Sequence, residues 1–398
     1  MKRIVLLTNM LTPYRKAFFG ELAEQGASQN IEFRILVMME NASNRTWEYS
    51  DLQSYNTELL KRCVLFGKSD TLCYNTNLRK RLNALKPDIL ILSGSYTLLP
   101  VWQAVHWAKN KECKIFFWSE SHLNESRNYN QFVYWIREHV RRRFYTKFAR
   151  GGYWYPGVKA RELIMQYGNR EAAYICVPNL IDNRNYCRLL DHITLSKDMI
   201  RNKYGLSKEK RLFFSIARLT WVKGIQPFMK AFIQVKNYEK IQLVIAGSGE
   251  LENELLEYAE HHNVDLMLLG YRNETEITEL LYCADCFFLP SLSDPNPLSC
   301  IEAIWCGKPV LVSEHVGNYP EVVESGENGY VFSYNDLRDF QKKITALLEA
   351  ESSWYEKAGA RSRQIAESRF EIGKSTAEII QKMKQLMSGE NLNGDKDT

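Results

Sequence analysis

Two basic side chains, five residues apart, follow a predicted strand in the second half of the chain. Arg218 and Lys223 lie on the loop between the strand expected at 211–217 and the next helix. An arginine offers a forked pair of N–H donors, a lysine offers a point charge, and the amino end of the following helix adds its dipole. The two cations predict a binding site for one diphosphate, although two solvated surface cations would have the same spacing.

Two carboxylates with seven residues between them form a second chemical feature. Asp294 lies on a Pro-rich loop, and Glu302 lies about one turn inside the helix that follows. Carboxylate oxygens are suitable acceptors for neighbouring sugar hydroxyls. Because both side chains can point into one cleft, we predict that they bind a sugar-containing ligand, but an acidic pair at this spacing is most often coincidental.

Glycines follow two further predicted strands in the same half. Gly247 and Gly249 form a turn into a helix, and Gly270 directly precedes Tyr271. A glycine lets the backbone approach a neighbouring group closely. We predict that the first turn approaches a ligand and that Gly270 and Tyr271 hold a flat base, with a simple turn as the alternative at Gly270.

Alternating strands and helices must position these loops. The expected strands are 3–8, 33–38, 89–93, 114–118 and 174–177, then 211–217, 241–246, 265–269, 286–289 and 308–312. Helices are expected near 14–25, 76–86, 98–109 and 130–149, after each strand of the second half, and near 335–349, 353–367 and 371–387, and segment 40–60 is expected to be a loop. This order predicts an α/β protein with two tandem Rossmann-like domains.

The predicted domains are 1–185 and 186–370, with a helix at 371–387 that crosses back to the first domain. The polar tail 388–398 is expected to be disordered. Ligands of open α/β sheets bind at the carboxyl ends of the strands. We therefore expect the two domains to face each other across a central cleft that holds the substrates.

Composition excludes several classes of protein. Of the 398 residues, 45% are hydrophobic and 25% are charged, which is typical of a folded chain rather than a disordered one. Nine cysteines without metal-ligand spacing predict reduced thiols, and we expect Cys283 and Cys286 to be a buried structural pair rather than a redox or zinc site. Because no stretch approaches the roughly 20 apolar residues of a membrane span, we predict a cytoplasmic protein with at most peripheral membrane contact.

Charge is divided unevenly along the chain. Residues 1–185 hold 27 basic and 16 acidic side chains, a net charge of +11, and the rest of the chain has a net charge of −6. The total of +5 is too mild to predict nucleic-acid binding. The helix expected at 130–149 places Phe132, Ile136, Val140, Phe144 and Phe148 at every fourth residue, with Arg137, Arg141, Arg142, Arg143 and Lys147 on its other faces. We expect the apolar stripe to pack on the sheet and the basic face to be solvated, or else to dock on an anionic membrane or near a lipid-diphosphate acceptor.

The order of these motifs resembles that of family 4 glycosyltransferases, which have the GT-B fold and retain anomeric configuration. The resemblance is dense over 211–332 and weaker in the first half. The matching motifs are Ala217-Arg218-x4-Lys223-Gly224, Ala246-Gly247-x-Gly249, Leu269-Gly270, Glu302-Ala303-x3-Gly307-x-Pro309-Val310 and Glu321-Val322-Val323-x2-Gly326-x2-Gly329. The sequence has one Asp-x-Asp, Asp395-Lys396-Asp397, and it lies in the polar tail rather than after a predicted strand, so we expect neither a catalytic metal nor another cofactor.

The resemblance implies roles for the motif residues. Arg218 and Lys223 match the pair that binds the donor diphosphate, and Glu302 matches the glutamate that binds ribose hydroxyls. Asp294 stands where the family has a glutamate that contacts the transferred sugar. The backbone amides of Leu298 and Ser299 are expected to touch donor phosphate or sugar.

The first domain is expected to hold the acceptor. Thr12 and Arg15 belong to a Thr-Pro-Tyr-Arg loop that resembles a subset of the family, and Arg15 either faces an anionic group or is an ordinary surface residue. A dinucleotide dehydrogenase is disfavoured, because its Gly-x-Gly-x-x-Gly is absent from this turn. By resemblance, His122 is expected to contact the donor sugar, with Glu120 as the alternative if the preceding strand ends earlier.

These features together predict a retaining hexosyltransferase. It would move a sugar from a UDP- or GDP-sugar to a glycan or polyprenyl-diphosphate-linked acceptor in the synthesis of a bacterial surface polysaccharide or lipopolysaccharide. Its cations would offset the charge that develops on the leaving diphosphate. The alternatives are a GT-B epimerase or hydrolase of nucleotide sugars, and a non-catalytic sugar-nucleotide-binding assembly subunit.

Overall fold

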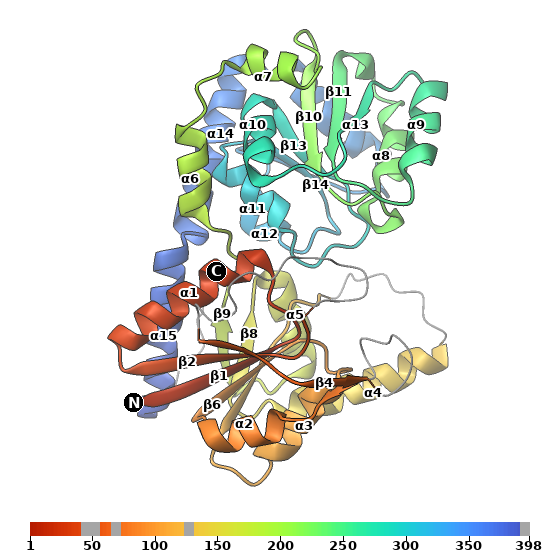
Figure 1. Ribbon diagram of the computed structural model, residues 1–398. Helices are drawn as coiled ribbons and strands as arrows, with labels where there is room; N and C mark the ends of the chain where they lie inside the picture. The colour runs from red at the N-terminus through yellow and green to blue at the C-terminus, as the bar shows by residue number, and fades with distance from the viewer. Residues whose placement is uncertain (41–55, 65–72, 123–130, 391–398) are drawn as a thin grey trace. The chain divides into compact units, whose positions relative to one another are not determined.

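The structure is a computed structural model that describes residues 1–40, 56–64, 73–122 and 131–390. The chain divides into two compact units (Figure 1): the described residues up to Ile181 and from Ile372 onward form unit 1, and Asp182–Glu371 form unit 2. Each unit contains a parallel sheet covered by helices, which confirms the predicted α/β class with two Rossmann-like sheets. Most of the predicted disordered tail lies outside the described residues.

Unit 1 is built on a seven-stranded sheet with the order β3-β2-β1-β6-β7-β8-β9, in which neighbouring strands are parallel. The strands are β1 (Lys2–Thr8), β2 (Ile31–Val37), β3 (Thr57–Leu59), β6 (Ile89–Ser93), β7 (Lys114–Trp118), β8 (Gly152–Tyr155) and β9 (Ala173–Cys176). Its helices are α1 (Pro13–Ser28), α2 (Leu78–Leu85), α3 (Leu99–Ala108), α4 (Gln131–Phe148), α5 (Val158–Tyr167) and α15 (Ile372–Ser388). A separate antiparallel pair is formed by β4 (Arg62–Val64) and β5 (Cys73–Asn75).

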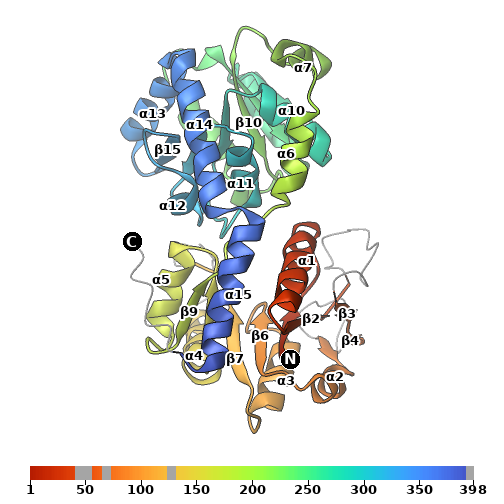
Figure 2. The ribbon, with the colours of Figure 1, turned by 90° about the vertical axis from the view of Figure 1, so that its left-hand side faces the viewer.

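Helix α15 lies beside α1 in unit 1, far from it in the sequence (Figure 2). It buries an apolar face that includes Ile379 and Met383. Hydrogen bonds fix both of its ends, because Gln25 Nε2 donates to the carbonyl of Gly373 at 3.1 Å and Lys114 Nζ to that of Leu386 at 3.1 Å. Apolar burial and these bonds place the last described helix in the unit that holds β1.

Unit 2 is built on a six-stranded parallel sheet with the order β12-β11-β10-β13-β14-β15. The strands are β10 (Arg211–Ile216), β11 (Ile241–Ala246), β12 (Leu266–Leu268), β13 (Cys286–Leu289), β14 (Val310–Ser313) and β15 (Gly329–Phe332). The helices are α6 (Asn183–Asp191), α7 (Lys197–Lys203), α8 (Ile225–Phe232), α9 (Glu252–His261), α10 (Glu274–Cys283), α11 (Leu298–Trp305), α12 (Tyr319–Val322), α13 (Leu337–Glu349) and α14 (Ser352–Arg369), with 3-10 turns η2 (Trp221–Lys223) and η3 (Tyr238–Lys240).

Each sheet has one point at which the chain reverses its winding direction. In unit 2 the strands follow one another from β10 to β12 on one side, and from β13 to β15 on the other. The loops after β10 and β13 therefore diverge at the carboxyl edge, and such switch points are where ligands bind in open α/β sheets. The corresponding point in unit 1 lies between β1 and β6.

Helix α4 corrects the prediction of an apolar stripe along its whole length. Phe144 is buried, and Val140 and Phe148 pack against the core of unit 1, but Phe132 and Ile136 are 67% and 41% exposed. The helix has 18 residues, about 27 Å, whereas β7 beneath it has five residues, about 17 Å. The first turns of α4 are exposed because they extend past the sheet that covers the rest.

No helix in the described part of the chain is long and apolar enough to span a membrane. Cys283 and Cys286 are both buried and form no disulfide. Burial raises the pKa of the Cys283 thiol to about 11, so it is a protonated, apolar-like side chain at neutral pH.

Candidate functional site

The loops after β10 and β13 are bound to each other at the switch point of unit 2. The amide of Leu292 donates to the carbonyl of Val222 at 2.8 Å, and Lys223 Nζ forms an ion pair with the carboxylate of Asp294. The two charged side chains are only 16% and 13% exposed. The structure thus brings Lys223 and Asp294 together, and a diphosphate at Lys223 must compete with a carboxylate that is already there.

The thiol of Cys300, on α11, shows that the second carboxylate belongs to the same neighbourhood. Burial raises the pKa of Cys300 well above its usual value, the charges of Asp294 and Glu302 raise it further, and that of Lys223 lowers it. All three charged groups therefore act on one buried atom. The predicted acidic pair and one of the two predicted cations therefore lie within electrostatic range of the same side chain of α11.

Glu302 is held by a residue that the sequence did not predict. Tyr186 on α6 donates its hydroxyl hydrogen to Glu302 Oε1 at 2.8 Å. Burial raises the pKa of Glu302 to about 7, the hydrogen bond from Tyr186 lowers it, and the charge of Glu274 raises it. Asp182 caps α6 by accepting a hydrogen bond from the amide of Asn185. This capping residue is a sequence signal for the helix, but nothing in the sequence indicates the contact between Tyr186 and Glu302, which are 116 residues apart.

Arg218 differs from Lys223 in its surroundings. It is exposed on the loop after β10, and within the described ranges its guanidinium makes no hydrogen bond or ion pair. The structure does not pair it with either carboxylate of the site. Arg218 therefore keeps its fork of N–H donors available for an anion, whereas Lys223 is already neutralised.

The glycine turn after β11 packs closely against the loop that carries Arg218, and the predicted contact of its glycines with a ligand stays a prediction. A Cβ on Gly247 would lie 2.0 Å from the carbonyl oxygen of Ala217, and one on Gly249 would lie 2.3 Å from that of Leu219. The amide of Leu219 also donates to the carbonyl of Ser248 at 3.0 Å. These glycines let the turn pack against the backbone around Arg218, so they position that loop.

Substitution of these glycines tests this packing role. Gly247 has a φ of +143° and no room for a Cβ, whereas Gly270 has a φ of +67° in open space. We expect Gly247→Ala to lower the free energy of unfolding by about 3–5 kcal/mol and Gly270→Ala by about 1–2 kcal/mol. Denaturant unfolding measures both, and equal losses would contradict the assigned role of Gly247.

Three other predicted donor contacts lie near this carboxyl edge. Tyr271 is 82% exposed, and the carbonyl of Gly270 beside it accepts from the amide of Gly247 at 2.8 Å. Leu298 and Ser299 begin α11, where the first amides have no acceptor within the helix. Their contacts with a base or a phosphate stay predictions.

Arg15 in unit 1 is buried, which excludes the alternative that it is an ordinary surface residue. Its guanidinium donates to Thr8 Oγ1 at 2.9 Å, to Ser93 Oγ at 3.2 Å and to Glu120 Oε1 at 2.7 Å. It also lies over the ring of Trp118, 4.6 Å from its centroid. Its anionic partner is therefore Glu120 of its own chain, and the two together join β1, β6 and β7 at their carboxyl ends.

His122 and Thr12 are also placed at this edge of unit 1. Both are buried, and Thr12 Oγ1 has no hydrogen-bond partner among the described residues. Glu120 is engaged by Arg15 and one-third exposed. The choice between His122 and Glu120 as the residue that contacts a sugar stays open.

Comparison with known proteins gives this geometry a context. Residues 196–366, which include Arg218, Lys223, Asp294 and Glu302, match the family described as Glycosyl transferases group 1. The chain is 26% identical over 196 residues to N-acetyl-alpha-D-glucosaminyl L-malate synthase of Bacillus anthracis, covering 49% of each protein. It is 33% identical over 156 residues to N,N'-diacetylbacillosaminyl-diphospho-undecaprenol alpha-1,3-N-acetylgalactosaminyltransferase of Campylobacter jejuni, covering 39% of this chain and 40% of that protein.

The whole chain has a counterpart among solved structures. Anabaena Alr3699/HepE in complex with UDP and glucose superposes with a TM-score of 0.70 at 16% identity, covering 97% of this chain and all of that one. This likeness shows the fold, which is GT-B as predicted. The matched segments span about half the length, or less, of the curated relatives.

Proposed function

We propose that this protein is a glycosyltransferase that moves a sugar from a nucleoside-diphosphate sugar to a glycan or lipid-linked acceptor in bacterial surface polysaccharide or lipopolysaccharide synthesis. One observation carries the proposal: Lys223 and Asp294 pair at the switch point of unit 2, with Glu302 on the adjoining helix. The segment that contains them is the one that matches the glycosyltransferase family.

The proposed chemistry assigns a task to each charged group. As the bond between sugar and diphosphate breaks, negative charge grows on the leaving diphosphate, and Arg218 and Lys223 offset it without a metal ion. Asp294, released from Lys223, accepts from hydroxyls of the transferred sugar, and Glu302 accepts from those of the ribose. Retention of anomeric configuration is part of the proposal and rests on the family resemblance.

The donor and acceptor are proposed from chemistry that similar proteins share. The Anabaena structure contains UDP and glucose, which favours a UDP-sugar over a GDP-sugar as the donor. The name of the Campylobacter relative contains a diphospho-undecaprenol group, which supports a polyprenyl-diphosphate-linked acceptor.

A thermal-shift screen tests the donor site. UDP-, GDP- and ADP-glucose are added to the wild type, to Arg218→Ala, and to Lys240→Ala, which removes an exposed cation at η3. We expect one nucleotide sugar at 100 times its Kd to stabilise the wild type and the Lys240 variant by about 2.7 kcal/mol, raising Tm by several degrees. The Arg218 variant should bind about tenfold more weakly.

Other outcomes of the screen would favour other functions. No shift with any nucleotide sugar would overturn the proposal. Release of free UDP from UDP-glucose at full turnover without an acceptor would indicate a hydrolase, and conversion to another nucleotide sugar an epimerase. Donor binding without turnover on any acceptor-containing membrane extract would indicate a non-catalytic subunit.

A further inference from the structure

A cavity of about 400 Å³ lies at the amino edge of the sheet of unit 2. Its lining includes Arg211, which begins β10, and Asp285 and Pro309, which directly precede β13 and β14. Arg218 and Asp294 follow the opposite, carboxyl ends of β10 and β13, and the six residues of β10 span roughly 17–20 Å. A ligand in this cavity is therefore distinct from a nucleotide at the proposed donor site, and the inference does not rest on sugar transfer.

The lining of the cavity carries a surplus of two positive charges. Four basic and two acidic residues contribute to it: Lys197, Arg211, Lys308, Arg363, Asp285 and Glu356. Arg363 is paired with Glu367, and Asp285 accepts from Arg201 at 2.9 Å. Neither Lys197 nor Lys308 forms an ion pair with a residue in the described part of the chain. The surplus is local, because residues 186–398 together have a net charge of −6.

Lys308 is a buried cation without a carboxylate in contact. It is 7% exposed, and its Nζ donates to the carbonyls of Tyr282 at 2.9 Å and Ala284 at 3.1 Å. Burial and the positive charge of Lys197 lower the pKa of Lys308 to about 8. Two of the three N–H donors of the ammonium are therefore taken by backbone dipoles, and an anion at the third would compensate a buried charge.

The second ammonium lies close to the first. The Nζ atoms of Lys197 and Lys308 are each 6.0 Å from the centroid of the Tyr282 ring. Two like charges at this range repel each other, and an anion between them relieves the repulsion. A phosphate monoester has close to two negative charges at neutral pH and balances the surplus, whereas a single carboxylate supplies half of it.

Other groups of the lining suit hydroxyls rather than a bare anion. Glu356 is exposed and forms no ion pair with the residues that the structure describes, and Ser352 lies on the same helix, α14. A carboxylate accepts hydrogen bonds from neighbouring hydroxyls, and a serine hydroxyl both donates and accepts. Because Glu356 would repel an isolated phosphate, a ligand that carries hydroxyls beside its phosphate fits this lining better. The volume of the cavity lies in the range of small-molecule sites.

We propose that the cavity at the amino edge of unit 2 binds the phosphate monoester of a small sugar. Lys197 and Lys308 contact the phosphate, and Arg211 adds to the positive potential around it. Ser352 and Glu356 bind the hydroxyls of the sugar. The ligand thus brings negative charge to the two ammonium groups and hydrogen-bond donors to the unpaired carboxylate.

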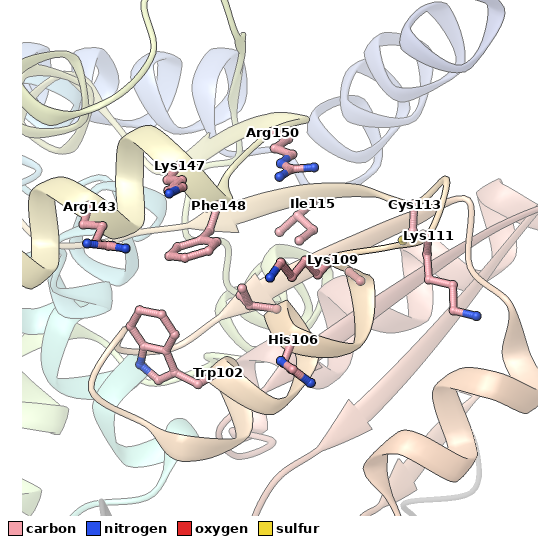
Figure 3. A pocket seen from close by; sticks show the side chains of 12 residues that line it. Trp102, His106, Lys109, Lys111, Cys113, Ile115, Arg143, Lys147, Phe148 and Arg150 are labelled. Carbon is pink, nitrogen blue, oxygen red and sulfur yellow. The ribbon is translucent and has the colours of Figure 1, made fainter.

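Unit 1 offers a matched control cavity. About 300 Å³ in volume, it is lined by basic residues that include Lys109, Arg143 and Lys147 (Figure 3). All three are exposed, and none of the described residues that line this cavity is a carboxylate. The unit 1 cavity therefore has positive charge without a buried ammonium or a carboxylate for hydroxyls, and it tests whether charge around a cavity is enough.

Calorimetric titration of the full chain with glucose 6-phosphate tests the proposal. Lys197→Gln should weaken binding about tenfold, because one charge-assisted hydrogen bond is lost, and Lys308→Gln should weaken it at least as much. Arg143→Gln in the unit 1 cavity and Arg218→Ala at the proposed donor site should leave the Kd within about twofold. Lys197 is exposed, so the test holds even if Lys308→Gln is unstable. No binding by the wild type, or equal losses in Lys197→Gln and Arg143→Gln, would overturn the proposal.

Titration with related probes tests the class of ligand. The wild type should bind glucose 6-phosphate about tenfold more tightly than inorganic phosphate, which lacks the hydroxyls, and than gluconate, which has a carboxylate in place of the phosphate. Glu356→Gln should bind inorganic phosphate more tightly than the wild type does and so reduce the preference for the sugar ester. Equal affinity for inorganic phosphate would overturn the assignment to a sugar ester, and equal affinity for gluconate the assignment to a phosphate.

Discussion

Asp294→Asn is expected to tighten the binding of the nucleoside diphosphate while it abolishes most transfer. In the structure, Asp294 neutralises Lys223. An amide in its place leaves the ammonium free for phosphate oxygens, so the Kd for UDP should fall about tenfold, in the range of one charge-assisted hydrogen bond. Transfer should fall at least about 100-fold, because Asp294 is proposed to accept hydrogen bonds from the sugar hydroxyls and an amide accepts them more weakly than a carboxylate.

Calorimetric titration with UDP and turnover of the UDP-sugar measure the two effects separately. The matched control is Glu314→Gln, which changes a carboxylate on the loop after β14 that bonds Ser333 and not Lys223. It should leave both the Kd and turnover within about twofold. Lys223→Ala should weaken UDP binding, whereas Asp294→Asn should tighten it.

The free energy of unfolding gives an independent test of the ion pair between Lys223 and Asp294. Because the pair is mostly buried, Asp294→Asn leaves an uncompensated ammonium and should lower the free energy of unfolding by about 2–4 kcal/mol. Saturating UDP should restore part of that loss by supplying a new counter-charge. If UDP binding were weakened by Asp294→Asn, the competition between carboxylate and diphosphate at Lys223 would be refuted.

The sheets were predictable where a buried strand is a short apolar run between turn residues. The strands at 241–246 and 286–289 match β11 and β13 at both ends, and each is buried along its whole length. The same signal is absent from β3, where Thr57 and Glu58 are polar and only pairing with β2 makes the strand. The prediction of a loop over 40–60 is therefore wrong at its end, and residues 41–55 lie outside the described ranges.

Strands β8 and β15 and helices α5, α6 and α7 were also missed. β8 follows directly after α4, and its sequence Gly-Tyr-Trp-Tyr gives four aromatic or small residues with no alternation. β15 begins at Gly329, whose Cβ would lie 1.9 Å from the carbonyl oxygen of Val310, so its glycine reflects tight pairing with β14 rather than a turn. Both strands depend on a neighbouring strand that local composition does not reveal.

The candidate site was predictable in its residue types but not in its internal pairing. Spacing along the chain placed Arg218, Lys223, Asp294 and Glu302 after strands that turned out to be neighbours in the sheet. The ion pair of Lys223 with Asp294 spans 71 residues of sequence, and the hydrogen bond to Glu302 comes from Tyr186 on a helix that was not predicted. Pairing of this kind is set by the order of strands, which no local pattern encodes.

Nucleotide binding is expected to rise with pH through the ionisation of Glu302. Burial raises the pKa of this carboxyl to about 7 from a usual 4.5. In its proposed role Glu302 accepts hydrogen bonds from two ribose hydroxyls, which requires the ionised carboxylate, so affinity for UDP should increase about tenfold from pH 6 to pH 8 and level off above. Glu302→Gln should bind weakly and without this pH dependence.

Two neighbours of Glu302 allow the midpoint of that curve to be moved in opposite directions. Tyr186→Phe removes the donor that stabilises the carboxylate and should shift the midpoint above 7, whereas Glu274→Gln removes a negative charge and should shift it below. If both variants had the midpoint of the wild type, the pH dependence would belong to another group.

The same carboxyl makes the stability of the protein depend on pH. Because the folded protein holds this proton between pH 4.5 and 7 and the unfolded chain does not, the stability that Glu302 contributes is lost as the pH rises through 7. Glu302→Gln should accordingly be more stable than wild type at pH 8, by up to about 3 kcal/mol, and similar to it below pH 4.5.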